Sequence, residues 1–318
     1  MFARTYLVGL LLTLSACSGP DEPGFRLGLL TWPGNEPVHF AREVGAIDSS
    51  RVEFVEFESP ADLASAFRLS GIDAACLTAD FAVDLAQASP DLRIVFVVSE
   101  SVGADVVLAR EEITDASELR GARIGVEVSP LGAHVLDGLL RHAGLEATDV
   151  ELVSVDVADH REAFDDHALD ALVTYQPYAE RATGDDGLHV VFDSSEIPDE
   201  IVDVVLTRQS VLETRELSLR HLIDGWTTTL ERIDRDLAAF VEFAAAHEAV
   251  SEETFLSILA GIEILDADDN RRLLVEEPGA MVEILRRCEA ALRRQGLIRE
   301  PVDLSHLPDG RFFAEHRP

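Results

Sequence analysis

The sequence predicts an α/β fold with two lobes, followed by a helical C-terminal part. Three observations support this prediction. From Phe25 onward, short apolar runs alternate with amphipathic stretches of about ten to fifteen residues, which is typical of parallel-sheet α/β proteins. From about Leu217 the pattern changes to helical periodicity only. Two short strings are also nearly repeated along the chain, which indicates that two similar units share the fold.

The predicted strands are short runs rich in Val, Ile, Leu and Phe. They are FRLGLL (25–30), VEFVEF (52–57), IDAACL (72–77), RIVFVV (93–98), RIGVEV (123–128), VELVSV (150–155), LDALVT (169–174) and HVVF (189–192). Amphipathic helices are expected between them. In residues 130–145, for example, one apolar face is formed by Val135, Leu136, Leu139, Leu140 and Ala143.

The near-repeats suggest how the two lobes are joined. ADVVLAR (104–110) resembles VDVVLTR (202–208), and we expect these strings to be two antiparallel strands that cross between the lobes. IDAACLT (72–78) resembles LDALVT (169–174), and we expect equivalent core strands, each ending in a threonine. Ligands of open α/β sheets bind outside such strand ends. Chance recurrence in a chain rich in Val, Ala and Asp is the alternative.

The composition fits a folded protein with an acidic surface. The chain has 318 residues, 47% of them hydrophobic, which is enough for two lobes with cores of their own. Its 60 acidic and 26 basic residues give a net charge of -34. Such a surface repels phosphates and anionic lipid headgroups, so we expect no nucleic-acid partner.

The N-terminus predicts secretion and lipid anchoring. Arg4 precedes the apolar run at 6–14, which is too short to span a bilayer, so residues 1–16 are interpreted as a signal peptide. The following LSAC resembles a bacterial lipobox, which implies lipidation of Cys17 and attachment to a membrane surface. An ordinary signal peptide with a chance cysteine is the alternative. Residues 17–24 are expected to form a tether.

Cysteine and histidine spacing indicates neither a metal site nor a redox motif. Cys76 and Cys288 are expected to be buried free thiols, and a disulfide between them stays open. The sequence has no CxxC or HExxH pattern and its ten histidines are scattered, so no metal and no cofactor are expected.

Several segments, in order, resemble the solute-binding proteins of ABC importers in the nitrate, sulfonate, taurine and thiamine-precursor branch. Trp32-Pro33-Gly34, Glu36-Pro37 and FAREVGAID are similar to the first strand, loop and helix of that family. The later segments are SGIDAACLTAD, SVGADVVLAR, ELRGARIGVE with SPLGAHVL, and LDALVTYQPYAER. The resemblance covers about residues 25–313. It implies a type II periplasmic-binding-protein fold, with residues 25–104 and 208–318 in lobe I and 105–207 in lobe II.

Two departures from the family pattern bear on chemistry. The cysteine run of the thiamine-pyrimidine synthases is absent, which disfavours their self-consuming reaction. Tyr175 and Gln176 stand where that family has tryptophan and glutamate, which leaves one acid fewer at the expected cleft.

Candidate ligand-binding residues lie at the expected strand ends and helix starts. Trp32 could stack on a planar solute or cover a cation, or could pack on its own loop. Asn35 and Glu36 could cap the next helix or bond a ligand, and capping is favoured. Further candidates are Thr78 and Thr174 with their neighbours Asp80, Tyr175 and Gln176.

A helix start and the two crossings supply the other candidates. Ser129 precedes Pro130 as an N-cap, and free backbone amides near Gly132 could receive an anionic group. Ser101 and Asp105 lie at the first crossing, and Asp203 occupies the place of Asp105 in the second. These acids could orient a solute amine or fix loop hydrogen bonds. No arginine is evidently placed for a strong anion, which leaves zwitterions, heterocycles and amines open.

We therefore expect a monomeric, non-enzymatic, lipid-anchored binding protein on the periplasmic or cell-surface face of a bacterial membrane. It would capture a small polar solute, sulfonate-, nitrate-, taurine- or pyrimidine-like, and deliver it to the permease and ATPase subunits of an ABC importer. One alternative is an enzyme of the same fold that uses Asp105 or Glu127 for proton transfer on an aromatic or pyrimidine-like acid. Another is a sensory binding lipoprotein. His134, inside a helical apolar pattern, is expected to be a core or surface residue.

Overall fold

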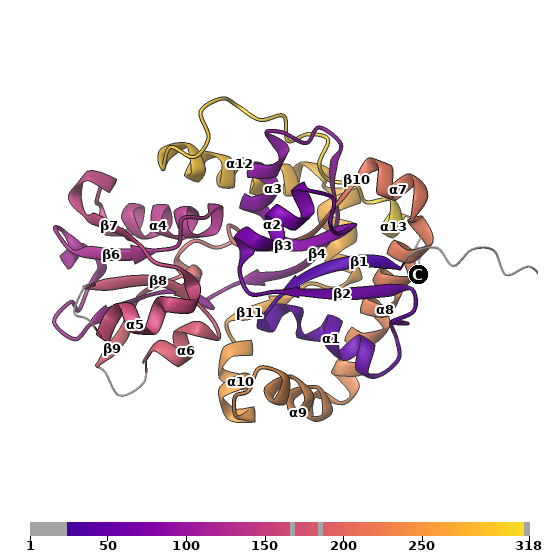
Figure 1. The fold of residues 1–318 in the computed structure, drawn as a ribbon, viewed down its shortest axis with the longest axis horizontal. Helices are drawn as coiled ribbons and strands as arrows, with labels where there is room; N and C mark the ends of the chain where they lie inside the picture. Colours follow the sequence, from indigo (N-terminus) through magenta and orange to yellow (C-terminus); the bar gives the residue numbers. More distant parts are fainter. Residues whose placement is uncertain (1–23, 166–168, 184–186, 315–318) are drawn as a thin grey trace, which may run out of the picture.

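The computed structural model describes residues 24–165, 169–183 and 187–314, which form two lobes joined side by side (Figure 1). Each lobe has one β-sheet with helices packed on it, so the predicted α/β class is confirmed. The expected signal peptide, Cys17 and nearly all of the expected tether lie outside the described residues. Within the described part, no helix is long and apolar enough to cross a membrane.

Lobe I contains a six-stranded sheet in the order β11-β4-β10-β3-β1-β2. Its strands are β1 (Phe25–Leu30), β2 (Val52–Phe57), β3 (Ala74–Thr78), β4 (Leu92–Ser101), β10 (Val202–Arg208) and β11 (Ile262–Ile264). Strands β1, β2 and β3 are parallel, and β10 runs antiparallel to both β3 and β4. All five residues of β3 are buried, as expected for a central strand covered on both faces.

Lobe II contains a five-stranded sheet in the order β7-β6-β8-β5-β9. Its strands are β5 (Asp105–Arg110), β6 (Arg123–Val126), β7 (Glu151–Ser154), β8 (Ala171–Tyr175) and β9 (Leu188–Asp193). Strand β5 runs antiparallel to β8, as β10 does to β3 in lobe I. The two pairs of near-repeats are therefore equivalent strands of two similar sheets.

The chain crosses between the lobes just before β5 and again just before β10. We expected the near-repeated strings to be the crossing strands themselves. Each string is instead the first strand after a crossing, β5 in lobe II and β10 in lobe I. The chain also returns to the six-stranded sheet before Val202, not at 208. The second crossing runs through a 3₁₀ turn, Ser194–Glu196, and the residues up to Ile201.

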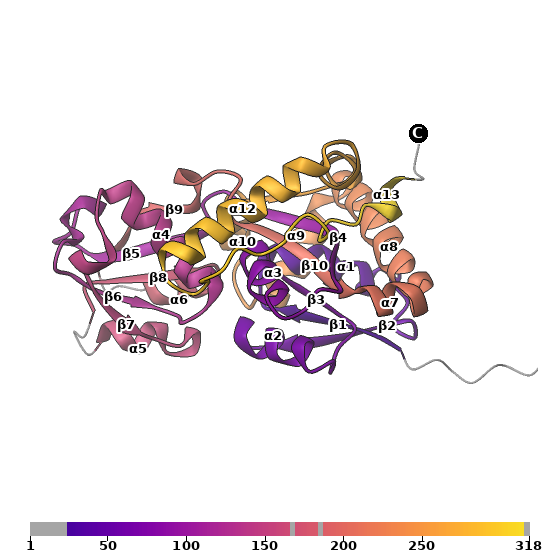
Figure 2. The same ribbon diagram turned by 90° about the horizontal axis from the view of Figure 1, so that it is seen from above.

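Most helices belong to lobe I, and one of them reaches both lobes. Lobe II carries α4 (Pro130–Ala143), α5 (His160–Asp165) and α6 (Tyr178–Thr183). Lobe I carries α1 (Glu36–Glu43), α2 (Pro60–Arg68), α3 (Ala79–Ala86), α7 (Gln209–Thr214), α8 (Glu216–Arg235), α9 (Leu237–His247), α10 (Glu252–Leu259), α11 (Ala267–Arg271), α12 (Pro278–Arg294) and α13 (Arg311–Ala314). Helix α12 packs on α3 of lobe I and on α4 of lobe II, and Figure 2 shows it lying across their boundary.

Two further details concern the C-terminal half. The expectation of helices only after Leu217 is wrong at β11, which extends the six-stranded sheet by pairing antiparallel with the end of β4. Helix α12 places Cys288 in the core, and both Cys76 and Cys288 are buried and free. Trp226 of α8 is fully buried and packs edge-on against Phe96, which fastens the helical part to the sheet.

Candidate binding cleft between the lobes

The ends of strands from both sheets enclose a small cavity between the lobes. Its volume is about 30 Å³, enough for one or two water molecules, so the lobes are closed on each other. The lining residues come from β1, β3 and β10 of lobe I, from β5 and β8 of lobe II, and from neighbouring loops and helices. They are Leu30, Trp32, Pro60, Thr78, Asp105, Leu131, Tyr175, Ile201 and Asp203.

Two aromatic side chains meet across this cavity. Trp32, in the loop between β1 and α1, packs edge-on against Tyr175 at the end of β8, with ring centroids 6.1 Å apart. Tyr175 in turn packs edge-on against Tyr178 at the start of α6. The Trp32 side chain is buried, and it also lowers the pKa of the Asp203 carboxyl. Two rings, one from each lobe, therefore line this cavity.

Two buried carboxylates face the same cavity from equivalent strand positions. Asp105 begins β5, and Asp203 lies in β10 and accepts a hydrogen bond of 2.7 Å from Ser99 Oγ. Burial raises the pKa of Asp105 to about 7; the hydroxyl of Ser101 opposes this rise and Asp203 adds to it. Burial also raises the pKa of Asp203 to about 7, against the lowering effect of Ser99 and Trp32. Neither carboxylate has a cationic side chain beside it among the residues that line the cavity.

A chain of buried polar groups behind the cavity links the lobes. The Thr78 hydroxyl donates to Asp80, and the other oxygen of Asp80 lies 3.3 Å from Nδ1 of His134 on α4. His134 Nε2 lies 3.1 Å from Glu200 in the second crossing. Although burial disfavours its charged form, contacts with Cys288, Asp80 and Glu200 hold the pKa of His134 well above its usual value. His134, expected in the core or at the surface, is buried and bridges the two lobes.

Helix α4 also carries ion pairs at the lobe boundary. Arg294 of α12 forms two hydrogen bonds to Asp137, of 2.7 and 2.6 Å. Arg141 bonds the same carboxylate and also Glu200, at 2.9 and 2.7 Å. The bidentate Arg294–Asp137 pair joins α12 of lobe I to α4 of lobe II, so it contributes to the contact between the lobes.

A second, smaller cavity of about 10 Å³ continues into lobe II beneath Tyr175. Its lining includes Glu127, Gly132, His160 and Thr174. A side chain at Gly132 would lie 2.4 Å from the carbonyl oxygen of Glu127, so only glycine fits this helix start. Thr174 Oγ1 is already bonded to His160 Nδ1 at 3.0 Å.

Buried serines tie the two crossings together. The hydroxyls of Ser101 and Ser194 lie 2.8 Å apart, and Ser101 Oγ accepts a bond from the Asp105 amide. Gly103, with φ of 131°, donates its amide to Ser194 Oγ at 2.7 Å. This backbone geometry favours glycine, and it lets the chain turn between the sheets within three residues.

The structure separates the predicted site residues into three groups. The first group lines the larger cavity: Trp32, Thr78, Asp105, Tyr175 and Asp203. Gly132 and Thr174 line the smaller one. The third group lines neither cavity: Asn35, Glu36, Asp80, Ser101, Ser129 and Gln176.

Most residues of the third group have visible structural roles. Asn35 was expected to cap α1, and this is wrong: its side chain instead donates to the Leu30 carbonyl and accepts from the Cys76 thiol, each at 3.1 Å. Ser129 is the predicted N-cap of α4, with Pro130 at the first helical position. Gln176 accepts a bond from the amide of Glu180 at the start of α6. Glu36 lies in a separate cluster with His247.

The sequence did not identify the aliphatic residues that line the larger cavity, nor two polar residues of the smaller cavity. Leu30, Leu131 and Ile201 contribute only aliphatic contact, which no motif marks. Glu127 and His160 enter the smaller cavity from loop ends. Glu127, placed inside a predicted strand, was considered only as a proton-transfer residue of the alternative enzyme, and no sequence signal marked His160.

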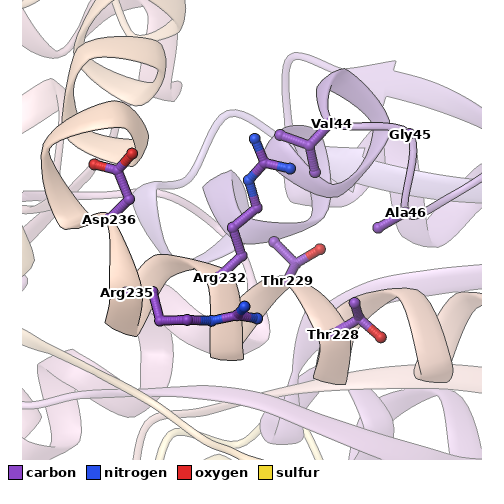
Figure 3. A pocket seen from close by; sticks show the side chains of 8 residues that line it. All are labelled: Val44, Gly45, Ala46, Thr228, Thr229, Arg232, Arg235 and Asp236. Atoms are coloured by element: carbon purple, nitrogen blue, oxygen red, sulfur yellow. The ribbon is translucent and has the colours of Figure 1, made fainter.

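A larger hollow lies away from the cleft, on lobe I between the end of α1 and α8 (Figure 3). Its volume is about 370 Å³, and Arg232 extends across it toward Val44. The side chain of Arg235 at its rim is 71% exposed. Because no strand end of either sheet reaches this hollow, we do not assign the solute site to it.

Two curated proteins are similar to part of the chain. A putative aliphatic sulfonates-binding protein of Escherichia coli is 29% identical over 151 residues, which cover 46% of this chain and 47% of that protein. A putative thiamine biosynthesis protein of Haemophilus influenzae is 27% identical over 155 residues, covering 48% and 49%. The chain thus matches about half the length of these relatives.

Solved structures match nearly the whole chain in fold. The periplasmic aliphatic sulphonate binding protein SsuA from Escherichia coli has a TM-score of 0.73 at 18% identity, over 92% of this chain and 94% of that one. The desulfurization enzyme DszB has a TM-score of 0.65 at 17% identity, over 92% and 98%. The fold therefore occurs both in binding proteins and in an enzyme, and its residues must decide between these functions.

The model of the NMT1-like family matches residues 18–247. This match covers more than half of the chain, and the structural neighbours share its two-lobed architecture. The chain belongs to the NMT1-like family and has the fold of the periplasmic binding proteins.

Proposed function

We propose that this protein is the extracytoplasmic solute-binding component of an ABC importer, and that it binds a small solute bearing a cationic or hydrogen-bond-donating nitrogen. The observation that carries the proposal is the closed cavity between the lobes, in which two buried carboxylates face a pair of aromatic rings. Such a cavity, mostly apolar with a few convergent polar groups, is typical of ligand sites.

The charges of the cleft select the class of solute. Asp105 and Asp203 are buried with raised pKa values of about 7, and no arginine lines the cavity among the described residues. A sulfonate or nitrate would meet these carboxylates without a compensating cation, which is unfavourable at low dielectric. An amine or an aminopyrimidine would instead donate hydrogen bonds to them while its body lies between Trp32 and Tyr175. An aminopyrimidine would also agree with the name of the Haemophilus influenzae relative.

Capture would proceed by closure of the lobes around the solute. A cavity of about 30 Å³ cannot admit an aminopyrimidine, so the lobes must separate before the solute enters. The two crossings, at 102–104 and 194–201, are the segments that would absorb this rotation. The solute shifts the equilibrium to the closed form because Trp32 and Tyr175, one from each lobe, contact it together only there.

The N-terminal sequence supports a membrane-attached location for this activity. Lipidation at Cys17 would leave the lobes on the periplasmic or cell-surface side, next to a permease and its ATPase. Replacement of Cys17 by serine should then move the protein from the membrane fraction to the soluble fraction. Retention of the variant in the membrane fraction would contradict lipid anchoring.

A second candidate is an enzyme, because acids with a pKa near 7 suit proton transfer at neutral pH. One feature weighs against a cysteine nucleophile. Burial raises the pKa of the Cys76 thiol well above its usual value, and its Sγ donates to Asn35. Mass spectrometry of the solute recovered from the protein separates the two functions, because an importer component returns it unchanged and an enzyme returns a product.

The proposal is tested by a thermal-shift screen of the protein lacking residues 1–17. Binding to the folded form raises the melting temperature, so a shift with amines or aminopyrimidines, and none with sulfonates or nitrate, is expected. Isothermal titration with Asp105→Asn should then show weaker binding of the same compound. A shift with sulfonates alone would refute the proposed solute class.

A further inference from the structure

A cluster of titratable side chains joins α1 to the end of α9 and takes no part in the cleft. One ligand atom each from Glu36, His39 and His247 lie within 4.8 Å of one another. Glu36 and His39 are three positions apart and share a face of α1, while His247 ends α9, 211 positions beyond Glu36. The Nδ1 atom of His247 lies 2.9 and 3.1 Å from the two Glu36 oxygens.

Several polar atoms of this cluster are buried without partners. Glu248, directly after His247, is 1% exposed, and neither of its carboxylate oxygens has a hydrogen-bond partner among the described residues. The same holds for Nδ1 of His39, which is 2% exposed. Buried polar atoms nearly always have partners, and a buried carboxylate without one is costly, so these atoms are available to bind a ligand.

The cluster gathers two buried carboxylates, those of Glu36 and Glu248, next to two imidazoles. Buried carboxylates need a positive charge or hydrogen-bond donors beside them. The unpartnered Nδ1 of His39 is a nitrogen that can bind a metal ion when the imidazole is neutral.

We propose that Glu36, His39 and His247, with Glu248 beside them, bind one divalent transition-metal ion of the zinc type. Two imidazole nitrogens with carboxylate oxygens form a donor set that suits Zn²⁺ or Co²⁺, whereas Mg²⁺ and Ca²⁺ require oxygen donors throughout. Neither histidine carries a recognisable metal motif, because the ligands come from two helices far apart in the sequence.

The ion would link α1, the helix after the Trp32 loop, to the end of α9 and the turn that leads to α10. The Glu248 carbonyl also accepts a hydrogen bond of 3.2 Å from Arg181 on α6 of lobe II. Metal binding would therefore order a segment that contacts the opposite lobe. The site is independent of the proposed solute, so either inference can fail without the other.

The test is isothermal titration of the untagged, chelator-treated protein with ZnCl₂, and of its variants His247→Ala and Glu248→Gln. We expect one Zn²⁺ per chain in the parent protein and an affinity at least tenfold lower in each variant. The matched control is His142→Ala, which removes a partly exposed histidine 3.4 Å from Glu196 and should leave the affinity unchanged. Glu248→Gln retains the side-chain volume and removes a buried charge, so this variant remains informative even where His247→Ala unfolds.

Co²⁺ supplies a second readout that general attraction to an acidic surface does not give. Binding by two imidazoles and carboxylates should produce the visible absorption of four-coordinate Co²⁺ in the parent protein, and His247→Ala should abolish it. Absence of stoichiometric binding would overturn the proposal. Equal binding by His247→Ala and His142→Ala would also overturn it, because the ions would then be held adventitiously by surface carboxylates.

Discussion

Replacement of Asp203 by asparagine should stabilise the protein while it weakens solute binding. The exchange retains the shape of the side chain and an oxygen that can accept the 2.7 Å hydrogen bond from Ser99. It removes a carboxylate whose pKa burial raises from 3.8 to about 7. Such a rise corresponds to about 4 kcal/mol of unfavourable free energy once the group is ionised in the folded protein.

The pH dependence of this effect follows from linkage. Between pH 3.8 and about 7 the folded protein binds more protons than the unfolded chain, so stability falls as pH rises through this window. The gain from Asp203→Asn should therefore be about 4 kcal/mol at pH 8 and under about 2 kcal/mol at pH 5. Urea unfolding of the solute-free proteins at both pH values measures it, with Asp224→Asn, an exposed acid of α8, as the control. Equal stability of Asp203→Asn and the parent protein at pH 8 would refute the reasoning.

Four further predictions concern the cleft, the lobe boundary and the core. Trp32→Ala should weaken solute binding about tenfold in isothermal titration because it removes one of the two rings, and unchanged affinity would contradict the stacking role. The affinity for a cationic solute should fall as pH drops from 8 to 6, since the two cleft acids become protonated near pH 7, and a pH-independent dissociation constant would exclude them as the binding groups. Arg294→Ala should enlarge the radius of gyration of the solute-free protein, because it removes two hydrogen bonds between Arg294 and Asp137 at the lobe boundary. Small-angle X-ray scattering measures this radius, and an unchanged value would mean that other contacts hold the lobes closed. Trp226→Ala should lower the free energy of unfolding by about 3–5 kcal/mol in urea titrations, because this fully buried ring packs on Phe96, and a loss under about 1 kcal/mol would show that the core repacks.

The α/β class, the core strands and the equivalence of the two sheets could be predicted from the sequence. Hydrophobic periodicity marks strands, and the near-repeats at 104–110 and 202–208 reflect equivalent positions beside β8 and β3. The crossings were misplaced because a crossing contributes only a few residues and has no periodicity of its own. Strand β11 was missed because three residues between helices give too short an alternation to detect.

The predicted residues that line the cavity are those for which a strand end dictates the direction of the side chain. Thr78, Asp105, Tyr175 and Asp203 lie at strand ends or starts, and both sheets direct these edges toward the cavity. The loop residue Asn35 could not be assigned in this way, because its direction depends on the 3₁₀ turn that precedes α1 and on the Cys76 thiol.

The pairing of His134 with Asp80 and Glu200 depends on how the lobes meet. That arrangement joins residues 54 and 66 positions apart, and local sequence carries no information about it.

In the importer role proposed above, helix α12 would make release of the solute the more demanding half of the transport cycle. This C-terminal helix packs on both α3 and α4, and its Arg294 is hydrogen-bonded to Asp137 of α4. The two lobes are therefore held together by contacts that do not involve a solute. Opening of the lobes would then break the Arg294–Asp137 bonds as well as the contacts of the solute itself. A membrane partner that breaks the Arg294–Asp137 pair would promote opening of the lobes, and so release of the solute, without entering the cavity. The exposed side of α12 is the surface that such a partner would contact first.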